Sequence, residues 1–171
     1  GDHPVIEYTK ICTMKKCIIF ICLAGYSCTL LAQDSIQNSG NLQVHSGAFV
    51  SGFGHFVNAS GSQLVNAGDL YLRRNLVNDE LSMTAGTGTL YLNGSSQQVI
   101  SGNQPFKTYN LSTDNAAGIL LNNDLSVAGA HTFTAGLIST SATPNYLVYE
   151  SGAGYSGDND SRHVNGWVKK N

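Results

Sequence analysis

The segments Asp69-Leu70-Tyr71-Leu72 and Thr89-Leu90-Tyr91-Leu92 are nearly identical, and they decide the fold. In an extended chain successive side chains point to opposite faces, so both leucines of each segment face one way and the tyrosine faces the other. Turn-forming residues follow both segments, at Arg73-Arg74-Asn75 and at Asn93-Gly94. Each segment is therefore expected to be a short β-strand with an apolar face and a mixed face.

Similar short runs recur along the chain, and each is bounded by Gly, Asn, Ser or Asp. No stretch after Ala32 shows the sustained three-and-four spacing of apolar residues that a helix requires. The further runs that we predict as strands are 41–44, 48–50, 98–100, 119–121 and 125–127. Leucine opens an alternating pattern at Leu42, Leu70, Leu90, Leu111 and Leu125, with gaps of 28, 20, 21 and 14 residues. The near-equal middle gaps indicate a degenerate repeat.

Two all-β architectures fit these short strands. A sandwich would connect neighbouring strands through hairpins, whereas a parallel β-helix would coil the chain with one turn per roughly 20 residues. Strands of three to five residues favour the coil, and so do corners rich in Asn, Gly and Asp, which tolerate left-handed backbone. We expect a parallel β-helix (solenoid) of about six turns around a narrow Leu/Val/Ile interior. A β-sandwich is the alternative.

The beginning of the chain has the parts of an export signal. Met14-Lys15-Lys16 precedes an apolar stretch that runs from Cys17 to Ala32, and a short apolar helix behind two lysines is typical of a secretory leader. We predict a helical signal peptide at 14–33 and an upstream or non-native extension at 1–13. Membrane contact is expected only through this peptide during export, so the product would be secreted or held at the cell surface (outer membrane, extracellular).

The composition of residues 34–171 excludes several classes of function. Six basic and nine acidic side chains remain there, a net charge of −3, with no basic cluster larger than a pair, so no nucleic-acid partner is expected. The four cysteines all precede this part, at Cys12, Cys17, Cys22 and Cys28. The segment therefore has no disulfide framework and no cysteine zinc site, and no cofactor is expected.

Residues that could carry catalysis are present but are not arranged in a known pattern. No Gly-x-Ser-x-Gly sequence occurs in the chain. Four histidines lie in separate, turn-rich contexts and are expected at the surface or at corners: His45, His55, His131 and His163. The adjacent acidic pair Asp79-Glu80 is expected in a solvated turn. These observations predict no catalytic site, and the chain is not expected to be an enzyme.

Two weaker candidate sites involve ligand binding. Asp158-Asn159-Asp160-Ser161 resembles a fragment of a calcium loop, but the closing glutamate is missing, so a plain polar turn is favoured over a metal site at Asp158 and Asp160. Tyr71, Tyr91 and Trp167 lie on strand-like runs and could stack on glycans. In a β-helix Tyr71 and Tyr91 would align on the outer surface, where stacking also simply stabilises the strands.

The order of motifs after Gly86 is more specific. Gly88-Thr89-Leu90-Tyr91-Leu92-Asn93-Gly94 leads into Gln97-Gln98-Val99-Ile100-Ser101-Gly102. Further along come Phe106-Lys107-Thr108-Tyr109-Asn110-Leu111, Asn122-Asn123-Asp124-Leu125-Ser126-Val127, Gly136-Leu137-Ile138 and His163-Val164-Asn165-Gly166-Trp167-Val168-Lys169. This order, over about residues 86–170, resembles a unit of large, repetitive bacterial surface proteins that are often cargo of the type IX secretion system.

The resemblance implies a right-handed β-helix stalk, export across both membranes, and a role in surface structure or adhesion. Such proteins usually carry a C-terminal sorting domain, whereas this sequence stops at Asn171, so 34–171 is expected to be a β-helix repeat segment in the N-terminal part of a longer protein. We therefore expect a structural or adhesive surface segment whose candidate partners are glycans or cell-surface molecules. The alternatives are a carbohydrate-binding module and, third, a β-helix polysaccharide-degrading enzyme.

Overall fold

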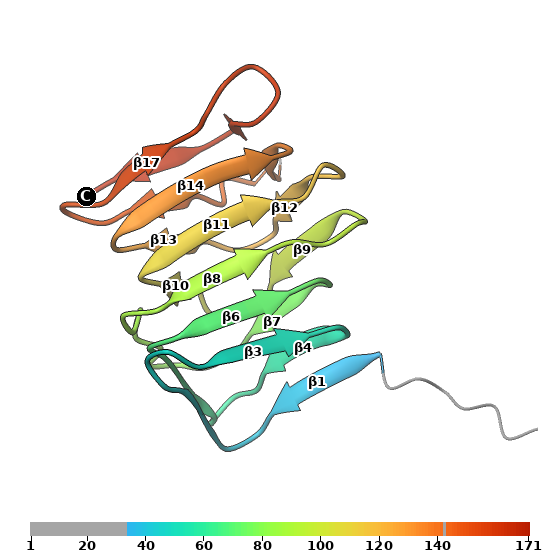
Figure 1. The fold of residues 1–171 in the computed structure, drawn as a ribbon, viewed down its shortest axis with the longest axis vertical. Helices are drawn as coiled ribbons and strands as arrows, with labels where there is room; N and C mark the ends of the chain where they lie inside the picture. The colour runs from blue at the N-terminus through green and yellow to red at the C-terminus, as the bar shows by residue number, and fades with distance from the viewer. Residues whose placement is uncertain (1–33, 142) are drawn as a thin grey trace, which may run out of the picture. The chain divides into compact units, whose positions relative to one another are not determined.

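The computed structural model describes residues 34–141 and 143–171, and these form an all-β solenoid (Figure 1). The predicted extension 1–13 and signal peptide 14–33 lie outside the described residues. The chain coils through about six turns in which each strand pairs with its equivalent one turn away. The predicted parallel β-helix is confirmed. Within the described ranges, the structure has no helix long and apolar enough to cross a membrane.

The strands stack into three faces. The seven-strand sheet contains, in spatial order, β1 (Ser35–Asn38), β4 (His55–Asn58), β7 (Leu76–Asn78), β9 (Gln98–Ser101), β12 (Ile119–Leu121), β15 (Ile138–Thr140) and β18 (Val164–Asn165). The six-strand sheet contains β3 (Phe49–Gly52), β6 (Asp69–Leu72), β8 (Thr89–Leu92), β11 (Asn110–Asp114), β14 (Ala130–Ala135) and β17 (Gly154–Ser156). In Figure 1 the six-strand sheet faces the viewer.

The third face is interrupted. It begins with the pair β2 (Asn41–Val44) and β5 (Gln63–Asn66) and resumes with β10 (Phe106–Thr108), β13 (Leu125–Val127), β16 (Leu147–Tyr149) and β19 (Val168–Lys170). Between β5 and β10 the third turn of the solenoid contributes no strand to this face. Residues 79–88, which connect β7 to β8, occupy that level as an irregular segment.

The register explains the unequal leucine gaps. Leu70, Leu90 and Leu111 are direct neighbours in the six-strand sheet, which is why they are 20 and 21 residues apart. Leu42 pairs with Leu64 and Leu125 pairs with Leu147 on the third face, so their gaps do not measure one turn. All pairs of named strands in the described part of the chain are parallel. The sandwich alternative, which needs antiparallel hairpins, is therefore wrong.

The interior is a single column of stacked apolar side chains. Its members are supplied by the inward positions of all three faces, and Leu72, Leu92, Leu121 and Ile138 are completely inaccessible to solvent. The sequence predicted an interior of Leu, Val and Ile, but the phenylalanines Phe56, Phe106 and Phe133 also lie in the column. Burial of this apolar surface is the main stabilising contribution.

Asparagines form a second, polar column beside the apolar one. The Nδ2 atom of Asn38 donates to Oδ1 of Asn58 over 2.8 Å, and Nδ2 of Asn58 donates to Oδ1 of Asn78 over the same distance. Asn58 and Asn78 are fully buried. Each amide offers both donors and an acceptor, so identical side chains can satisfy one another from turn to turn. The asparagine column therefore occupies interior positions that apolar side chains could fill, and its amide groups are paired with one another.

Glu80 bonds to the middle of this asparagine column, at the interrupted level of the third face. Its Oε2 atom accepts from Asn58 Nδ2 over 2.7 Å and from the backbone N–H of Leu64 over 3.0 Å. The prediction of a solvated turn for Asp79-Glu80 is wrong for Glu80, which is buried. The carboxylate takes the place of the strand neighbour that β5 lacks on this side, so the N–H of Leu64 remains satisfied.

Candidate functional site

The six-strand sheet carries a hollow on its outer surface near the first two turns. We call it the aromatic groove, and its six lining residues come from β3, β6 and the turns that follow β6 and β8: Phe49, Ser51, Asp69, Tyr71, Arg73 and Asn93. Its volume is about 400 Å³. The sheet is rigidly held from inside by Leu70, Leu72, Leu90 and Leu92, so the outward side chains stand on a fixed base.

Strand register places these side chains in columns that run along the solenoid. Ser51 pairs with Tyr71, and Tyr71 pairs with Tyr91, so the three lie one above another. The rings of the two tyrosines are stacked, with centroids 4.2 Å apart and an angle of 9° between their planes. Because their backbones are register partners, the planes lie across the solenoid axis, like the turns themselves. The ring of Tyr71 therefore has one face against Tyr91 and its other face toward Ser51.

Two phenylalanines flank Ser51 on the same outer surface. Phe49 is 74% exposed and Phe53 is 65% exposed, which is unusual for side chains of this size. They precede and follow Ser51 by two residues: Phe49 points outward from β3, and Phe53 is exposed directly after the end of that strand. The small Ser51 side chain leaves a gap between the two rings, and Tyr71 forms the roof of this gap.

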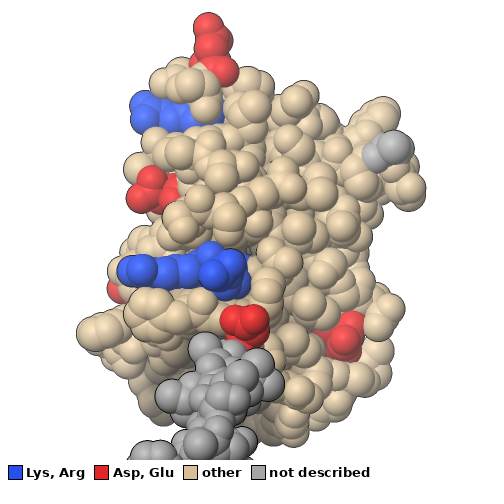
Figure 2. Space-filling model, turned by 90° about the vertical axis from the view of Figure 1, so that its right-hand side faces the viewer, with Lys and Arg blue, Asp and Glu red and all other residues tan. Residues whose placement is uncertain are grey.

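Polar groups of both signs border the gap. Asp69 is the register partner of Phe49, and the Arg73 guanidinium carbon lies 4.9 Å from the centroid of the Phe53 ring, a cation–π contact. Burial and then the nearby Asp69 carboxylate and Tyr71 raise the pKa of Tyr91, so its hydroxyl stays neutral at physiological pH. Figure 2, which views the solenoid from the side where the six-strand sheet turns toward the seven-strand sheet, shows that charges on that side are few and scattered.

Asn93 contributes an incompletely satisfied amide to the groove. Its Oδ1 atom is buried and has no hydrogen-bond partner among the described residues. A buried amide oxygen without a donor is unfavourable. No internal bond through this oxygen therefore holds the amide in place.

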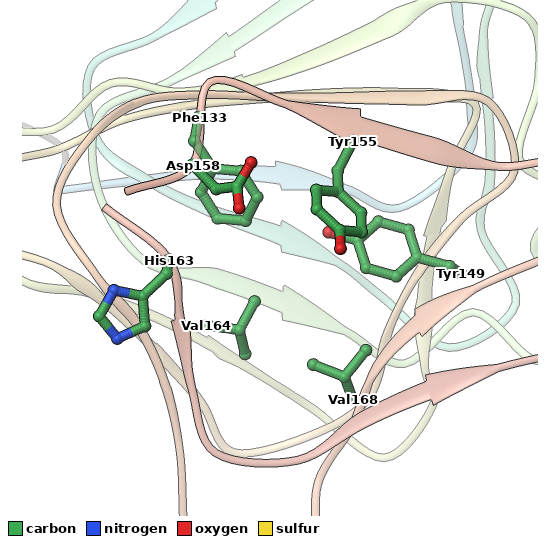
Figure 3. A pocket seen from close by; sticks show the side chains of 7 residues that line it. All are labelled: Phe133, Tyr149, Tyr155, Asp158, His163, Val164 and Val168. Carbon is green, nitrogen blue, oxygen red and sulfur yellow. The ribbon is translucent and has the colours of Figure 1, made fainter. Parts of the chain in front are cut away.

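A second hollow, of about 300 Å³, lies at the level of the last strands. It is lined by Phe133, Tyr149, Tyr155, Asp158, His163, Val164 and Val168. Figure 3 shows the hydroxyls of Tyr149 and Tyr155 and the carboxylate of Asp158 directed inward, while the His163 ring is turned away. This cavity continues the interior column, because Phe133 and Tyr149 are core residues. Part of its lining therefore packs inside the last turns, whereas Tyr155 and Val168 are exposed.

His131 is the main correction to the expected histidine positions. It was predicted at the surface or a corner, but it lies on β14 with no exposed surface. Its Nε2 atom is 3.2 Å from Thr113 Oγ1 and its Nδ1 atom is 2.7 Å from the Tyr149 hydroxyl. Burial lowers the pKa of His131 to about 3, so the ring is neutral and serves as a polar link inside the column. Burial also raises the pKa of Tyr149.

The structure brings two of the three predicted aromatic residues together. Tyr71 and Tyr91 form the stack, but Trp167 lies between β18 and β19 and packs edge-on against Tyr146, with ring centroids 6.4 Å apart. Sequence reasoning missed the other groove residues. The alternation of Phe49, Ser51 and Phe53 was a signal that would have placed them on one outward face.

The weak calcium candidate at Asp158 and Asp160 gains no support from the geometry. Asp158 lines the terminal cavity, and the intervening turn is held by Asn159, whose backbone exchanges hydrogen bonds with Arg162 and whose Oδ1 accepts from Ser161. Within the part of the chain that the structure describes, no three or more His, Cys, Asp or Glu side chains are grouped so that they could hold a metal ion.

The described chain is thus a parallel β-solenoid with an aromatic groove on one sheet. Comparison with known proteins found no matching family model, no matching curated protein and no matching solved structure.

Proposed function

We propose that this chain is an exported structural or adhesive β-helix segment of a cell surface, without catalytic activity. The observation that carries the proposal is the continuous interior: an apolar column runs through successive turns, and an asparagine column joins the first three of them. In such a solenoid each turn is held by its neighbours along its whole length, which gives a stiff body suited to displaying a surface away from a cell.

The polar residues of the interior support a structural role. Asn58, Asn78 and Glu80 bond to one another or to the backbone inside the column, and His131 bonds to Thr113 and Tyr149. These buried groups hold neighbouring turns of the same chain together, and they do not line the aromatic groove. The motif resemblance over 86–170 and the signal-like segment at 14–33 support export, with type IX secretion as the proposed route.

Surface exposure can be tested with an epitope inserted in the exposed turn beside Asn159. The tagged full-length chain is expressed in its source cells, and intact cells are treated with an added protease before immunoblotting. We expect the epitope to be removed from intact cells, while a cytoplasmic marker survives. An epitope that is cleaved only after lysis would overturn the proposal.

Carbohydrate binding is the second candidate function, and the aromatic groove is the specific observation that favours it. The third candidate, polysaccharide degradation, generally requires carboxylates that converge on one site. Asp69 is the single carboxylate among the six residues that line the groove, so the groove supports binding better than hydrolysis.

A further inference from the structure

We propose that the aromatic groove binds a neutral polysaccharide of pyranose sugars, with one sugar ring stacked on the Tyr71 face that looks toward Ser51. This inference deepens the adhesive role proposed above by naming its ligand class. It rests on the shape of the slot, on the polar groups at its two sides and on the balance of their charges.

The shape of the slot comes from the end of a two-ring stack, because the outward column runs Ser51, Tyr71, Tyr91 and Ser112 from turn to turn. Tyr91 and Tyr71 stack at 4.2 Å, but the next position down the column is Ser51. Adjacent strands lie about 4.8 Å apart, so replacing a ring by a serine hydroxymethyl leaves a gap of about one ring thickness. Phe49 lines this gap, and Phe53 lies two residues beyond Ser51 against the Arg73 guanidinium; both phenylalanines keep their apolar surfaces exposed. A flat ring with apolar C–H faces fits such a space.

The polar groups suit hydroxyl-bearing ligands. Asp69 and Arg73 flank Tyr71 at two residues before and two residues after it, so they project from the same surface. Carboxylate oxygens accept hydrogen bonds from hydroxyls, and the guanidinium offers several donors in one plane. Asn93 adds an amide whose Oδ1 has no partner among the described residues. The groove therefore combines a stacking surface with a few placed polar groups, the usual composition of a small-molecule site.

The charge balance selects a neutral ligand over an anionic one. The carboxylate of Asp69 and the guanidinium of Arg73 are both at the groove, and their charges oppose each other. The Arg73 guanidinium is also partly engaged with the Phe53 ring. A polyanionic glycan would need an excess of cations, which the residues that line the groove do not supply.

The test uses the full chain and titrates it by calorimetry with cello-, xylo-, manno- and maltohexaose as neutral probes and with hexagalacturonate as the anionic arm. We expect saturable binding of at least one neutral probe. Tyr71→Ala should lower its affinity about tenfold, because it removes the stacking surface. Tyr71→Phe keeps the ring and should remain within about twofold of the unaltered chain.

Ser51→Tyr is the sharper variant, because it fills the slot and leaves the other five lining side chains in place. Ser51 is exposed, so the variant should fold, which circular dichroism and the thermal midpoint check, and it should abolish binding. Tyr109→Ala is the matched control, since it removes an exposed aromatic side chain outside the groove, and it should bind normally. Failure of every neutral probe, binding of hexagalacturonate alone, or full affinity in folded Ser51→Tyr would each overturn the inference. None of these results bears on the protease test of surface exposure, so the two proposals fail separately.

Discussion

Asn58 donates a hydrogen bond to the carboxylate of Glu80 over 2.7 Å, and both side chains are buried. The two residues belong to successive turns of the solenoid, 22 positions apart. Asn58 uses its second amide hydrogen on Asn78 Oδ1, so its donor capacity is filled. This pair joins the asparagine column to the irregular segment 79–88 and gives the third turn a fixed conformation in place of a strand.

Replacement of Glu80 by alanine should destabilise the fold by about 3 kcal/mol, because the Asn58 amide and the Leu64 N–H would each lose a buried partner. Glu80→Gln keeps one acceptor oxygen and should lose about 1 kcal/mol. Urea unfolding monitored by circular dichroism measures both. Asp79→Ala is the matched control, since Asp79 accepts only exposed hydrogen bonds from Asn103. Equal losses for the Glu80→Ala and Asp79→Ala variants would show that Glu80 has no special role.

The asparagine column predicts an order of stabilities. Asn58 bonds to Asn38 below, to Asn78 above, and also to Ser62 and Glu80, whereas Asn38 has a column neighbour on one side. Asn58→Ala should therefore cost about 3 to 4 kcal/mol and Asn38→Ala about 1 to 2 kcal/mol. Thermal and urea unfolding of the two variants compare them directly. The reverse order would mean that the column does not act as a continuous ladder.

His131 should make the stability depend on pH. Its pKa is about 3 in the folded chain and about 6.5 when unfolded, so only the unfolded state takes up a proton between these values. The stability is therefore fully present above pH 6.5 and is lost as the pH falls, by roughly 1.4 kcal/mol per pH unit down to about pH 3. From pH 7 to pH 5 the expected loss is about 2 kcal/mol.

The contribution of His131 can be isolated with the His131→Gln variant, whose amide can still reach hydroxyl partners but does not titrate. The variant should be less stable at pH 7, because the contacts with Thr113 and Tyr149 are disturbed, yet its stability should change little between pH 7 and pH 5. Urea unfolding at the two pH values gives the slopes. A slope in the variant equal to that of the unaltered chain would assign the pH dependence to other groups.

Two glycines with left-handed backbone allow the effect of backbone strain to be measured separately from the effect of steric crowding. Gly47 and Gly136 have nearly equal φ angles of +77° and +79°, so alanine is strained at both by about 1 to 2 kcal/mol. A Cβ atom at Gly47 would meet open space, whereas one at Gly136 would overlap the backbone oxygen of Asn115 in the neighbouring turn. Gly136→Ala should therefore lower the thermal midpoint clearly more than Gly47→Ala. Equal effects would show that the turns separate easily at this corner.

The sequence predicts the strands whose alternation is regular. Asp69–Leu72 and Thr89–Leu92 have the predicted bounds, because leucine and tyrosine alternate and turn residues follow. The strand His55–Asn58 was not predicted, since its inward Asn58 has the chemistry of a turn residue. Only its neighbours 20 positions away, Asn38 and Asn78, make that position favourable inside. The 20-residue spacing of these asparagines was the available signal.

The candidate site was harder to predict, because it depends on register. The stacking of Tyr71 on Tyr91 follows from two similar segments 20 residues apart, and it is confirmed. The slot beside Tyr71 depends on Ser51, whose pairing with Tyr71 is not evident from local sequence. In the same way His131 has no local feature that marks it as buried, since its partners Thr113 and Tyr149 are each 18 residues away.

The irregular segment 79–88 has a consequence for how this architecture can change over time. On the third face it fills a level that a strand would otherwise occupy, while the other two sheets continue past it in register. Insertions in this stretch would be absorbed locally as long as the Glu80 carboxylate, the buried Met83 side chain and the bonds of Thr87 and Gly88 to the Asn66 carbonyl keep their places. The solenoid thus has one segment whose length can change without a shift in the stacking of the turns above or below it. New surface features can arise in this segment.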